Sequence, residues 1–336
     1  MRIERWDPAD TATALALYEV YRAAELADDP VSPPDSAGVF RAHLAGSWEG
    51  AQGEVWYVPG ADGGAVGFYR LDLPDLENTG RAALDLVVHP AARRRGIGRE
   101  LLRHAAERAA ASGREFLDSG LLADSAGEAF AKRLGAAFTL EEVRRVQYLN
   151  KIPPGTVASL RAEAARKAAG YSLASWREPP PEEYLAGIAG VLNAFGDAPR
   201  GEGVEAAAWD ADRVRQRTGR LAREGHWRAY AVAALHDESG EMAAFTRVTV
   251  DPEQPGWGHQ QVTAVTRSHR GHRLGLLVKT AMLEWLADAE PELERIETGN
   301  AASNDHMIAV NEALGYEVVA PSWKMYEIPV HAALGV

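Results

Sequence analysis

The sequence predicts an α/β (α+β) chain of two similar domains, each with a mixed, mostly antiparallel central sheet flanked by helices. Its length of 336 residues exceeds a typical single core and suits two domains of about 150–170 residues each. One glycine-bearing segment occurs twice, 177 residues apart. Strand-type and helical runs also follow the same order in both halves. A tandem repeat of one fold accounts for all three observations.

The repeated segment runs from Val88 to Arg99 and again from Val265 to Leu276. In each copy an apolar strand-type run precedes the segment and a helical run follows it. The first backbone N–H groups of a helix have no partner within the helix, and the helix dipole adds positive potential there. Each copy therefore predicts an anion-binding site, and the repeat indicates phosphate-bearing ligands for both halves.

In the first half, the clearest element is a hairpin, because Gly60 to Gly64 is a glycine-rich turn between two strand-type runs. Asp7 and Pro8 predict the start of the first helix, and three prolines between Asp28 and Ser36 predict a loop. The expected elements are, in order, strand 2–6, helix 12–26, strands 55–58, 65–71 and 83–88, helix 101–110, strand 115–117, helix 126–134 and strand 142–149.

The second half repeats this order. Pro179 to Glu182 introduces its first helix, and Asp237 to Gly240 predicts the turn of a second hairpin. The expected elements are strand 171–176, a helix through 192, strands 228–235, 241–250 and 261–265, helix 277–287, strand 295–298, helix 305–314 and a final strand at 324–328.

Pro153, Pro154 and Gly155 break the chain between the halves, which predicts domains at residues 1–152 and 156–336. An alanine-rich helical run follows over residues 157–169. This run fits either a connector between the domains or an ordinary packed helix.

Composition excludes several classes of function. The absence of cysteine rules out disulfides, thiolate zinc sites and a cysteine nucleophile, and the spacing of His, Asp and Glu predicts no metal site. A net charge of −12 disfavours nucleic acid as a partner and mildly favours a cationic amine. The first residues contain no signal segment and no run approaches 18 apolar residues, so a cytoplasmic protein without a membrane partner is expected.

The first copy of the repeated segment reads Val-x-Pro and then Arg-x-x-Gly-x-Gly, ending at Gly98, and resembles the acetyl-coenzyme A loop of GNAT acetyltransferases. The resemblance covers nearly the whole chain, as two tandem GNAT domains. It implies acetyl-CoA as co-substrate, no metal, and direct attack of a small molecule's primary amine on the thioester. Glycines let the backbone approach the pyrophosphate, whose oxygens the N–H groups face. The residues predicted to bind the coenzyme here are Val87, Val88, Arg93, Arg94, Arg95, Gly96, Ile97, Gly98 and Arg99.

The second copy departs from this pattern, since Arg273 stands where the family usually has its first glycine. Gly271 supplies a glycine earlier in the loop, and three basic side chains remain, so pyrophosphate binding is still expected. The residues predicted to bind the coenzyme in this half are Thr263, Val265, Arg270, Gly271, His272, Arg273, Leu274, Gly275 and Asn304.

GNAT enzymes commonly carry Asn-x-x-Ala-x-x-x-Tyr on a later helix, where the Asn contacts the pantetheine arm and the Tyr protonates the departing thiolate. In the second half Asn304 matches the Asn, and Asn311 replaces the Tyr. In the first half Asp124 and Ala131 stand at these positions. The first half therefore has the better phosphate loop and the poorer catalytic helix.

The family's general base is often a Glu eleven residues before the first basic residue of the loop. That position is His259 in the second half and Ala82 in the first. A histidine titrates near neutral pH and can take a proton from an ammonium group directly or through water. We therefore expect the second domain to be catalytic, with His259 as base and Asn311 contacting the thiolate or pantetheine. The alternative for His259 is a solvent-facing residue after a turn.

Asn311 cannot act as an acid, so Tyr326 and Tyr316 are the candidates, unless the thiolate leaves unassisted or takes its proton from water. Both tyrosines also fit core packing. Asp197 follows the first helix of the second domain, where it is expected to pair with the acceptor's ammonium group. The predicted function is acetyl-CoA-dependent N-acetylation of a small-molecule amine. The alternative is a non-catalytic acyl-CoA-binding or scaffold protein with two degenerate sites.

Overall fold

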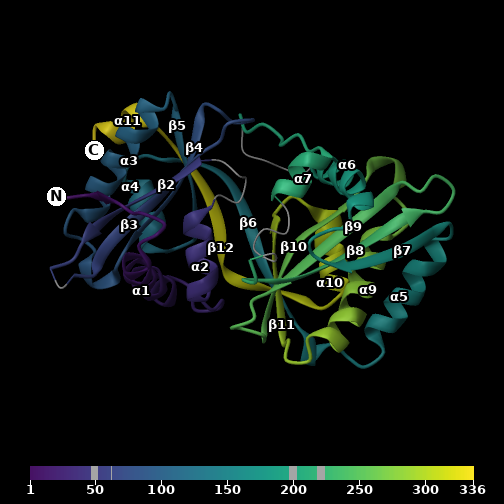
Figure 1. The fold of residues 1–336 in the computed structure, drawn as a ribbon. Coiled ribbons are helices and arrows are strands. Elements are labelled where there is room, and N and C mark those ends of the chain that lie inside the picture. Colours follow the sequence, from purple (N-terminus) through teal and green to yellow (C-terminus); the bar gives the residue numbers. More distant parts are fainter. Residues whose placement is uncertain (47–51, 62, 197–202, 218–223) are drawn as a thin grey trace. The chain divides into compact units, whose positions relative to one another are not determined.

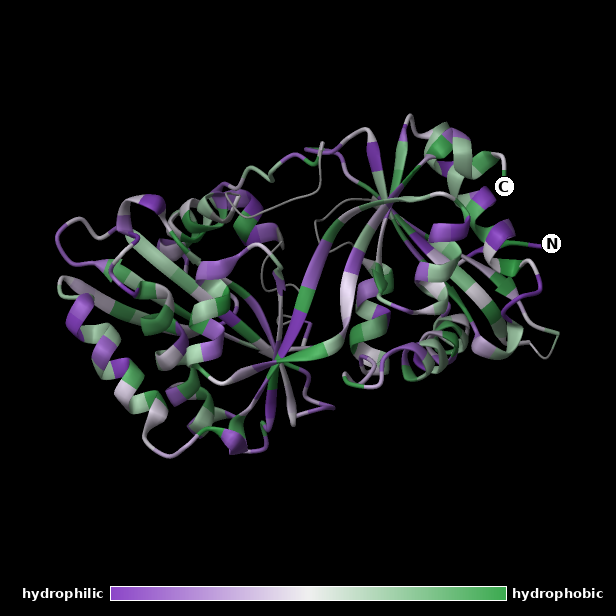
Figure 2. Cartoon of the chain, turned by 180° about the vertical axis from the view of Figure 1, so that it is seen from behind, coloured by the Kyte–Doolittle hydropathy of each residue, from purple (hydrophilic) through white to green (hydrophobic). Residues whose placement is uncertain are grey.

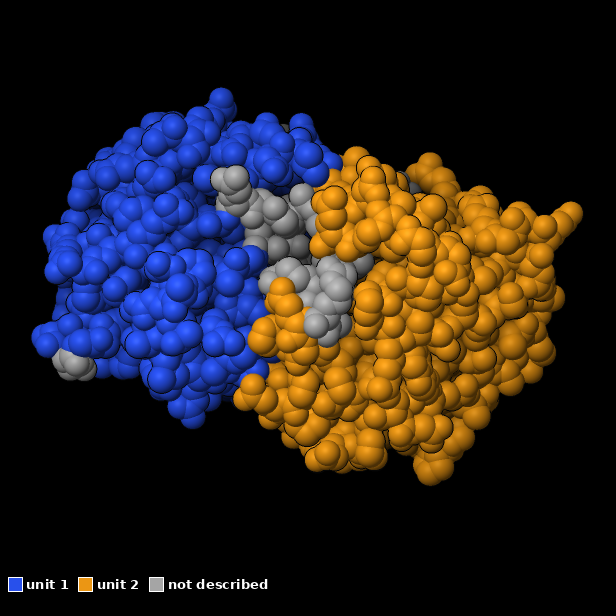
Figure 3. All heavy atoms as spheres, in the orientation of Figure 1, with its two compact units in different colours: residues 1–142, 200–205, 320–336 blue, residues 143–199, 206–319 orange. Residues whose placement is uncertain are grey.

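The computed structural model describes residues 1–46, 52–61, 63–196, 203–217 and 224–336 (Figure 1). The chain forms two compact units, which Figure 3 distinguishes by colour. Unit 1 consists of residues 1–142, 200–205 and 320–336, and unit 2 of residues 143–199 and 206–319.

Unit 1 is a sheet with the strand order β1-β2-β3-β4-β5-β12. β4 and β5 run parallel, and the other neighbouring pairs are antiparallel. Its elements are β1 (Glu4–Arg5), α1 (Thr11–Asp28), α2 (Ala37–Ala45), β2 (Gln52–Pro59), β3 (Ala65–Leu73), β4 (Arg81–Val88), α3 (Ile97–Ala111), β5 (Phe116–Leu122), α4 (Ala126–Arg133), most of β12 (Tyr316–Pro329) and α11 (Val330–Leu334).

Helices cover both faces of this sheet. Phe68 of β3 packs with α1 and α2, whereas its neighbour Tyr69 packs with α3 on the other side. Successive side chains of a strand point to opposite faces of the sheet. The two neighbouring residues of β3 therefore show that α1 and α2 lie on one face and α3 on the other. Green and purple alternate along the helices in Figure 2, as expected for elements that bury only one side.

Unit 2 has the order β7-β8-β9-β10-β11-β6, in which β10 and β11 run parallel and the pairs from β7 to β10 are antiparallel. Its sheet is covered by α5 and α9 on one face and by α6 and α7 on the other. Its elements are the second half of β6 (Ala137–Tyr148), α5 (Thr156–Lys167), β7 (Tyr171–Arg177), α6 (Leu185–Phe195), α7 (Ala211–Arg217), β8 (Arg228–His236), β9 (Met242–Val250), β10 (Trp257–Val265), α9 (Leu274–Ala289), β11 (Arg295–Ala301) and α10 (Asp305–Ala313).

The predicted class of a mixed, mostly antiparallel sheet flanked by helices is confirmed in both halves. The alanine-rich run left open between connector and packed helix is α5, a packed helix. Ala164 belongs to the core of unit 2, and Arg161 forms an ion pair with Glu284 of α9 at 3.2 Å. Among the described residues, no helix is both long and apolar enough to cross a membrane.

The last strand of each half completes the sheet formed by the other half. β12 pairs antiparallel with β5, so that Tyr326 lies opposite Ser119, and β6 lies beside β11. The compact units therefore differ from the contiguous domains 1–152 and 156–336 expected from the sequence. The physical reason is that strands pair through backbone groups, which are alike in both halves, so the last strand of one half can pair with the sheet of the other.

Candidate functional site

The first repeated loop is a concave backbone segment in front of α3. Arg94 and Gly96 have positive φ angles of 66° and 84°, and the helix starts at Ile97. Left-handed residues in such a turn direct consecutive N–H groups toward one point. The first N–H groups of α3 face the same side because they have no partner within the helix. The segment is therefore suited to hold a phosphate group, as the sequence predicts.

The side chain of Arg93 ties this loop to α1. Its two terminal nitrogens donate to Asp28 at 2.9 and 2.5 Å, and its Nε donates to the Val88 carbonyl at 3.2 Å. Its charge is thus neutralised within the protein. The exposed side chains of the loop that can add positive charge for a ligand are those of Arg94, Arg95 and Arg99.

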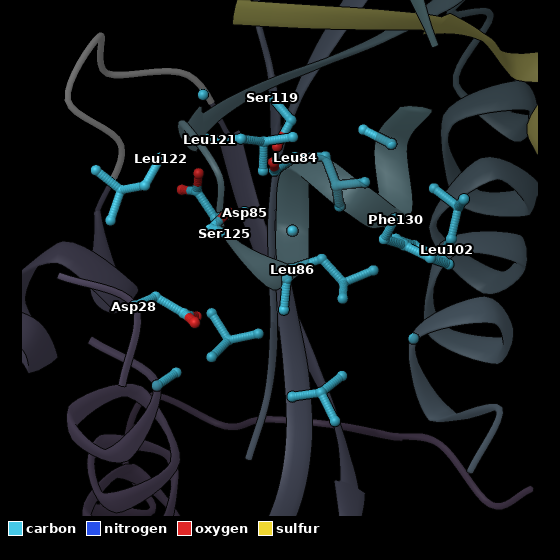
Figure 4. Close-up of a pocket in the computed structure, with 18 of the residues that line it drawn as sticks. Asp28, Leu84, Asp85, Leu86, Leu102, Ser119, Leu121, Leu122, Ser125 and Phe130 are labelled. Carbon is cyan, nitrogen blue, oxygen red and sulfur yellow. Dashed lines mark hydrogen bonds between the residues drawn. The ribbon is translucent and has the colours of Figure 1, made fainter. Parts of the chain in front are cut away.

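A cavity of about 970 Å³ begins at this loop and extends through the middle of unit 1 (Figure 4). The register of β4 with β5 ends at Ala83 and Asp118, and the cavity opens where the two strands part. Beyond that point the hydroxyl of Ser119 donates to the Leu84 carbonyl at 2.9 Å. The apolar walls include Leu86, Leu102, Leu121, Leu122 and Phe130.

Asp85 is the titratable group on β4 that faces this cavity. It shares the α1 and α2 face of the sheet with Val87, whereas Leu84 and Leu86 face α3. Its side chain is exposed within the cavity, and desolvation by the surrounding protein atoms raises its pKa above the ordinary value, with Arg70 opposing the shift. A carboxylate with a raised pKa inside a cleft is suited to accept a proton.

Tyr326 lies in the wall of this cavity, although the sequence assigned it to the second domain. The exchange of β12 brings it there, and its hydroxyl donates to Glu128 of α4 at 2.8 Å. Burial by itself would raise the pKa of Glu128. The hydrogen bonds from Lys132, the Asp124 amide, Tyr326 and Lys324 outweigh burial and lower that pKa to about 2.

The second loop has the same backbone conformation as the first, but the glycine and the arginine at its two left-handed positions are interchanged. Gly271 and Arg273 have positive φ angles of 90° and 55°, at the positions of Arg94 and Gly96 in the first loop. The glycine thus moves to the other left-handed position, and an arginine occupies the one before α9. Arg273 also pairs with Glu163 of α5 at 2.6 Å.

The predicted site residues of the second half make separate sets of contacts in the structure. His259 is half-buried in β10, opposite Thr249 and Glu297 of the neighbouring strands. Thr263 is buried, and its hydroxyl bonds that of Thr246 at 2.8 Å. Asn304 caps α10 by accepting from the Met307 amide. Asp197 lies outside the described residues.

Asn311 is fully buried and is the centre of a polar chain. Its Oδ1 accepts from Lys279 Nζ at 2.7 Å, and its Nδ2 donates to Asn300 Oδ1 at 2.7 Å. Burial lowers the pKa of Lys279 to about 7, and its Nζ lies 4.6 Å from the centre of the Tyr316 ring. The amide of Asn311 is thus already bonded to protein groups on both sides.

Asp85 and the cavity were missed by the sequence reasoning. Asp85 is the single carboxylate within the otherwise apolar run from Ala82 to Val88, and an acid in such a run was a usable signal. No group of three or more His, Asp or Glu side chains in the described part of the chain is arranged to hold a metal ion.

Two models of one protein family match the chain. Residues 52–135 match the acetyltransferase (GNAT) domain, and residues 193–316 match the acetyltransferase (GNAT) family. The chain is 30% identical to a tandem GNAT protein from the clavulanic acid biosynthesis pathway, over 98% of each chain and with a TM-score of 0.80. A GCN5-related N-acetyltransferase from Sphaerobacter thermophilus, 19% identical with a TM-score of 0.65, shares the fold.

Two curated relatives are mycothiol acetyltransferases. The protein from Sanguibacter keddieii is 29% identical over 310 residues, which is 90% of this chain and 89% of its own length. The protein from Geodermatophilus obscurus is 38% identical over 100 residues, which is 30% of each chain.

Proposed function

Because the chain belongs to the GNAT family of acyltransferase enzymes, with two such domains in tandem, we propose that it moves the acetyl group of acetyl-CoA to the primary amine of a small molecule in the cavity of unit 1. The observation that carries this proposal is the continuity of one cavity from the phosphate-binding loop to Asp85. A coenzyme bound at the loop can place its acyl end beside that carboxylate.

The loop and the parting strands supply the coenzyme site. The pyrophosphate lies against the N–H groups ahead of α3, with Arg94, Arg95 and Arg99 adding charge. The pantetheine arm enters between β4 and β5, along the apolar wall that includes Leu86 and Phe130. A Cβ atom at Gly98 would lie 3.8 Å from both Phe130 and Val88, at the entrance of this path.

Asp85 receives the proton of the reacting amine. The neutral amine attacks the thioester carbonyl, so that a C–N bond forms and the C–S bond breaks, and the proton lost by nitrogen passes to the Asp85 carboxylate. The thiolate takes a proton from Tyr326, the phenol on the α4 side of the wall, or from water. Direct attack needs no acyl-enzyme, which suits a chain without cysteine.

The alternative is that the reaction takes place in unit 2, with His259 as the base and Asp197 binding the acceptor. Unit 1 is preferred for two reasons. Asp85 faces a cavity that reaches the loop, and Asn311 of unit 2 has its amide bonded within the protein. The family also favours an enzyme over the non-catalytic acyl-CoA-binding scaffold.

The test is release of CoA thiol from acetyl-CoA in the presence of polyamines, aminoglycosides, amino acids and aromatic amines. N-acetyl products are identified by mass. We expect thiol release that depends on at least one amine. Acetyl-CoA binding without transfer to any amine would favour the scaffold alternative and contradict the proposal.

A further inference from the structure

The cavity of unit 1 passes between helices α3 and α4. Leu102 of α3 lines it from one side, and Phe130 and Ala131 of α4 line it from the other (Figure 4). This part of the cavity, between Leu102 and Ala131, is the arm slot, because the pantetheine arm of the coenzyme passes through it in the proposed function. Apolar side chains leave the slot open in unit 1.

The same two helix positions carry polar residues in unit 2. Lys279 of α9 stands at the position of Leu102, at the 177-residue spacing of the repeat. Helices α4 and α10 are both followed by Leu-Gly, and the amide of that leucine donates to the carbonyl three residues earlier, which is Ala131 in α4 and Asn311 in α10. Asn311 therefore stands at the position of Ala131.

Lys279 and Asn311 form a bridge between α9 and α10. Lys279 Nζ donates to Asn311 Oδ1 at 2.7 Å, and Asn311 Nδ2 donates to Asn300 Oδ1 of β11 at 2.7 Å. Lys279 is 2% exposed and Asn311 is fully buried. One buried polar chain thus joins two helices and a strand at the place where unit 1 has its arm slot.

An arm in unit 2 would break this bridge. Ligand atoms between α9 and α10 would separate Lys279 from Asn311 and leave each buried polar group without its partner, which costs free energy. In unit 1 the arm passes the apolar side chains of Leu102 and Ala131, which have no hydrogen bond to lose. The two units therefore differ in the cost of admitting an arm, although their loops share one backbone conformation.

We infer that the bridge between Lys279 and Asn311 closes unit 2 to the pantetheine arm, so that the acyl end of the coenzyme is bound in unit 1 alone. The second loop is then limited to contacts with the phosphate end of a coenzyme. This inference rests on the proposed function for the path of the arm through unit 1. It makes Lys279 and Asn311 the residues that determine which unit receives the acyl group.

An introduced thiol can report where the arm lies, because the chain contains no cysteine. Ser119 and Thr298 are matched positions for it. Each comes directly after the last residue that its strand pairs in parallel, and each hydroxyl donates to a carbonyl of the neighbouring strand, at 2.9 Å to Leu84 and at 3.5 Å to Gln260.

The probe is the mixed disulfide of CoA and 2-thiopyridine, which transfers CoA to a thiol within reach of its arm and releases 2-thiopyridone. A small pyridyl disulfide without the nucleotide measures the accessibility of each thiol by itself. Ser119→Cys should react about 100-fold faster with the probe than with the small reagent. Thr298→Cys should show no such preference. The mass of the protein identifies the adduct.

Changes at the bridge should move this preference. Lys279→Leu with Asn311→Ala gives unit 2 the side chains of unit 1, and should raise the preference of Thr298→Cys for the probe about tenfold. Asn311→Asp keeps an acceptor for Lys279 and should leave the preference unchanged. Ala131→Asn narrows the arm slot of unit 1 and should lower the preference of Ser119→Cys.

Two results would overturn the inference. One is a preference of Thr298→Cys for the probe while the bridge is intact, and the other is the lack of a preference once the bridge is removed. The proposed function fails separately. If Ser119→Cys prefers the probe, and Thr298→Cys does so only without the bridge, but no amine is acetylated, the inference stands and the function is wrong. If amines are acetylated and Thr298→Cys prefers the probe with the bridge intact, the function stands and the inference is wrong.

Discussion

The two units share the backbone conformation of the repeated loop and differ in the residue types that adopt it. In each loop two positions have a left-handed backbone conformation. Glycine occupies the second of them in unit 1 (Gly96) and the first of them in unit 2 (Gly271). Their partners, Arg94 and Arg273, adopt a conformation that favours glycine. The comparison teaches that the same loop conformation can form with its glycine at either of the two left-handed positions.

The centre of each unit differs more than its loop. Asp85 of β4 lies opposite Arg70, and at the same point of unit 2 Val262 lies opposite Arg247. Unit 2 therefore lacks the carboxylate that faces the cavity of unit 1. Positions on two helices and one strand differ too: Leu102, Leu121 and Ala131, which line the cavity of unit 1, correspond to Lys279, Asn300 and Asn311 of unit 2.

The largest expected effect tests which centre performs the reaction. Asp85→Asn should lower kcat/KM by about 10²–10⁴, because a general base contributes that much. His259→Ala should leave kcat/KM nearly unchanged. Thiol release from acetyl-CoA measures both. The reverse order of effects would move the reaction to unit 2.

The pH profile sharpens the same comparison. Asp85 must be ionised to accept a proton, and burial raises its pKa. Activity should therefore fall as pH drops through that raised pKa, at a higher pH than for an exposed aspartate. A wild-type profile that Asp85→Asn leaves unaltered in shape would exclude Asp85 as base.

The next effect concerns the coenzyme. Gly98→Val places methyl groups toward Phe130 and Val88 at the cavity entrance, and should weaken acetyl-CoA binding in unit 1 by about 10–100-fold. Gly275→Val should remove only binding at the second loop. Calorimetric titration reports both sites, and thiol release should be lost in the first variant alone. Loss of activity in the second variant instead would contradict the assignment.

A smaller effect, on the stability of the protein, is expected when two polar residues of unit 2 are replaced by the residues found at the same positions of unit 1. Lys279→Leu with Asn311→Ala removes a buried ammonium group and its partner, and should stabilise the protein at pH 7 by about 1–4 kcal/mol. Either single variant leaves a buried polar group without its partner and should be less stable than the double variant. Denaturant unfolding measures all three.

The pH dependence of that advantage has a defined sign. Lys279 has a folded-state pKa of about 7 against an ordinary value of 10.5. Below pH 7 Lys279 is protonated in both the folded and the unfolded state, so the wild type bears the full free-energy cost of burying its ammonium group. Between pH 7 and 10 the unfolded state holds a proton that the folded state has released, so the wild type gains stability and the advantage of the double variant shrinks. A constant difference across this range would show that Lys279 is not buried as a cation.

The smallest effect separates the two loops. Gly96→Arg should cost about 1–2 kcal/mol of stability, because a side chain must enter the left-handed conformation. Arg273→Gly should change stability by less than about 1 kcal/mol, because relief of that conformation offsets the greater freedom of glycine when unfolded. Equal costs in both directions would show that the loops are not equivalent in shape.

Local sequence signals predicted most of the elements and both loops. The turn at Gly60 to Gly64 marked the hairpin of β2 and β3, and the prolines at 179–181 preceded α6. Such signals reside in a few adjacent residues, so they survive in any tertiary arrangement. Helices α2, α7 and α11 were not predicted, since they are short and rely on packing for their stability.

The amino-acid sequence by itself determined the class of fold, its repetition, the place of both glycine-bearing loops and the absence of thiol chemistry, because each depends on residue identity and short-range spacing. Tertiary structure decided which sheet β12 completes, and with it the presence of Tyr326 in the cavity of unit 1. It also paired Arg93 with Asp28 and placed Asp85 in the lining of that cavity. These outcomes depend on which distant segments pack together, and the backbone groups through which β6 and β12 pair carry no local mark of the sheet they will join.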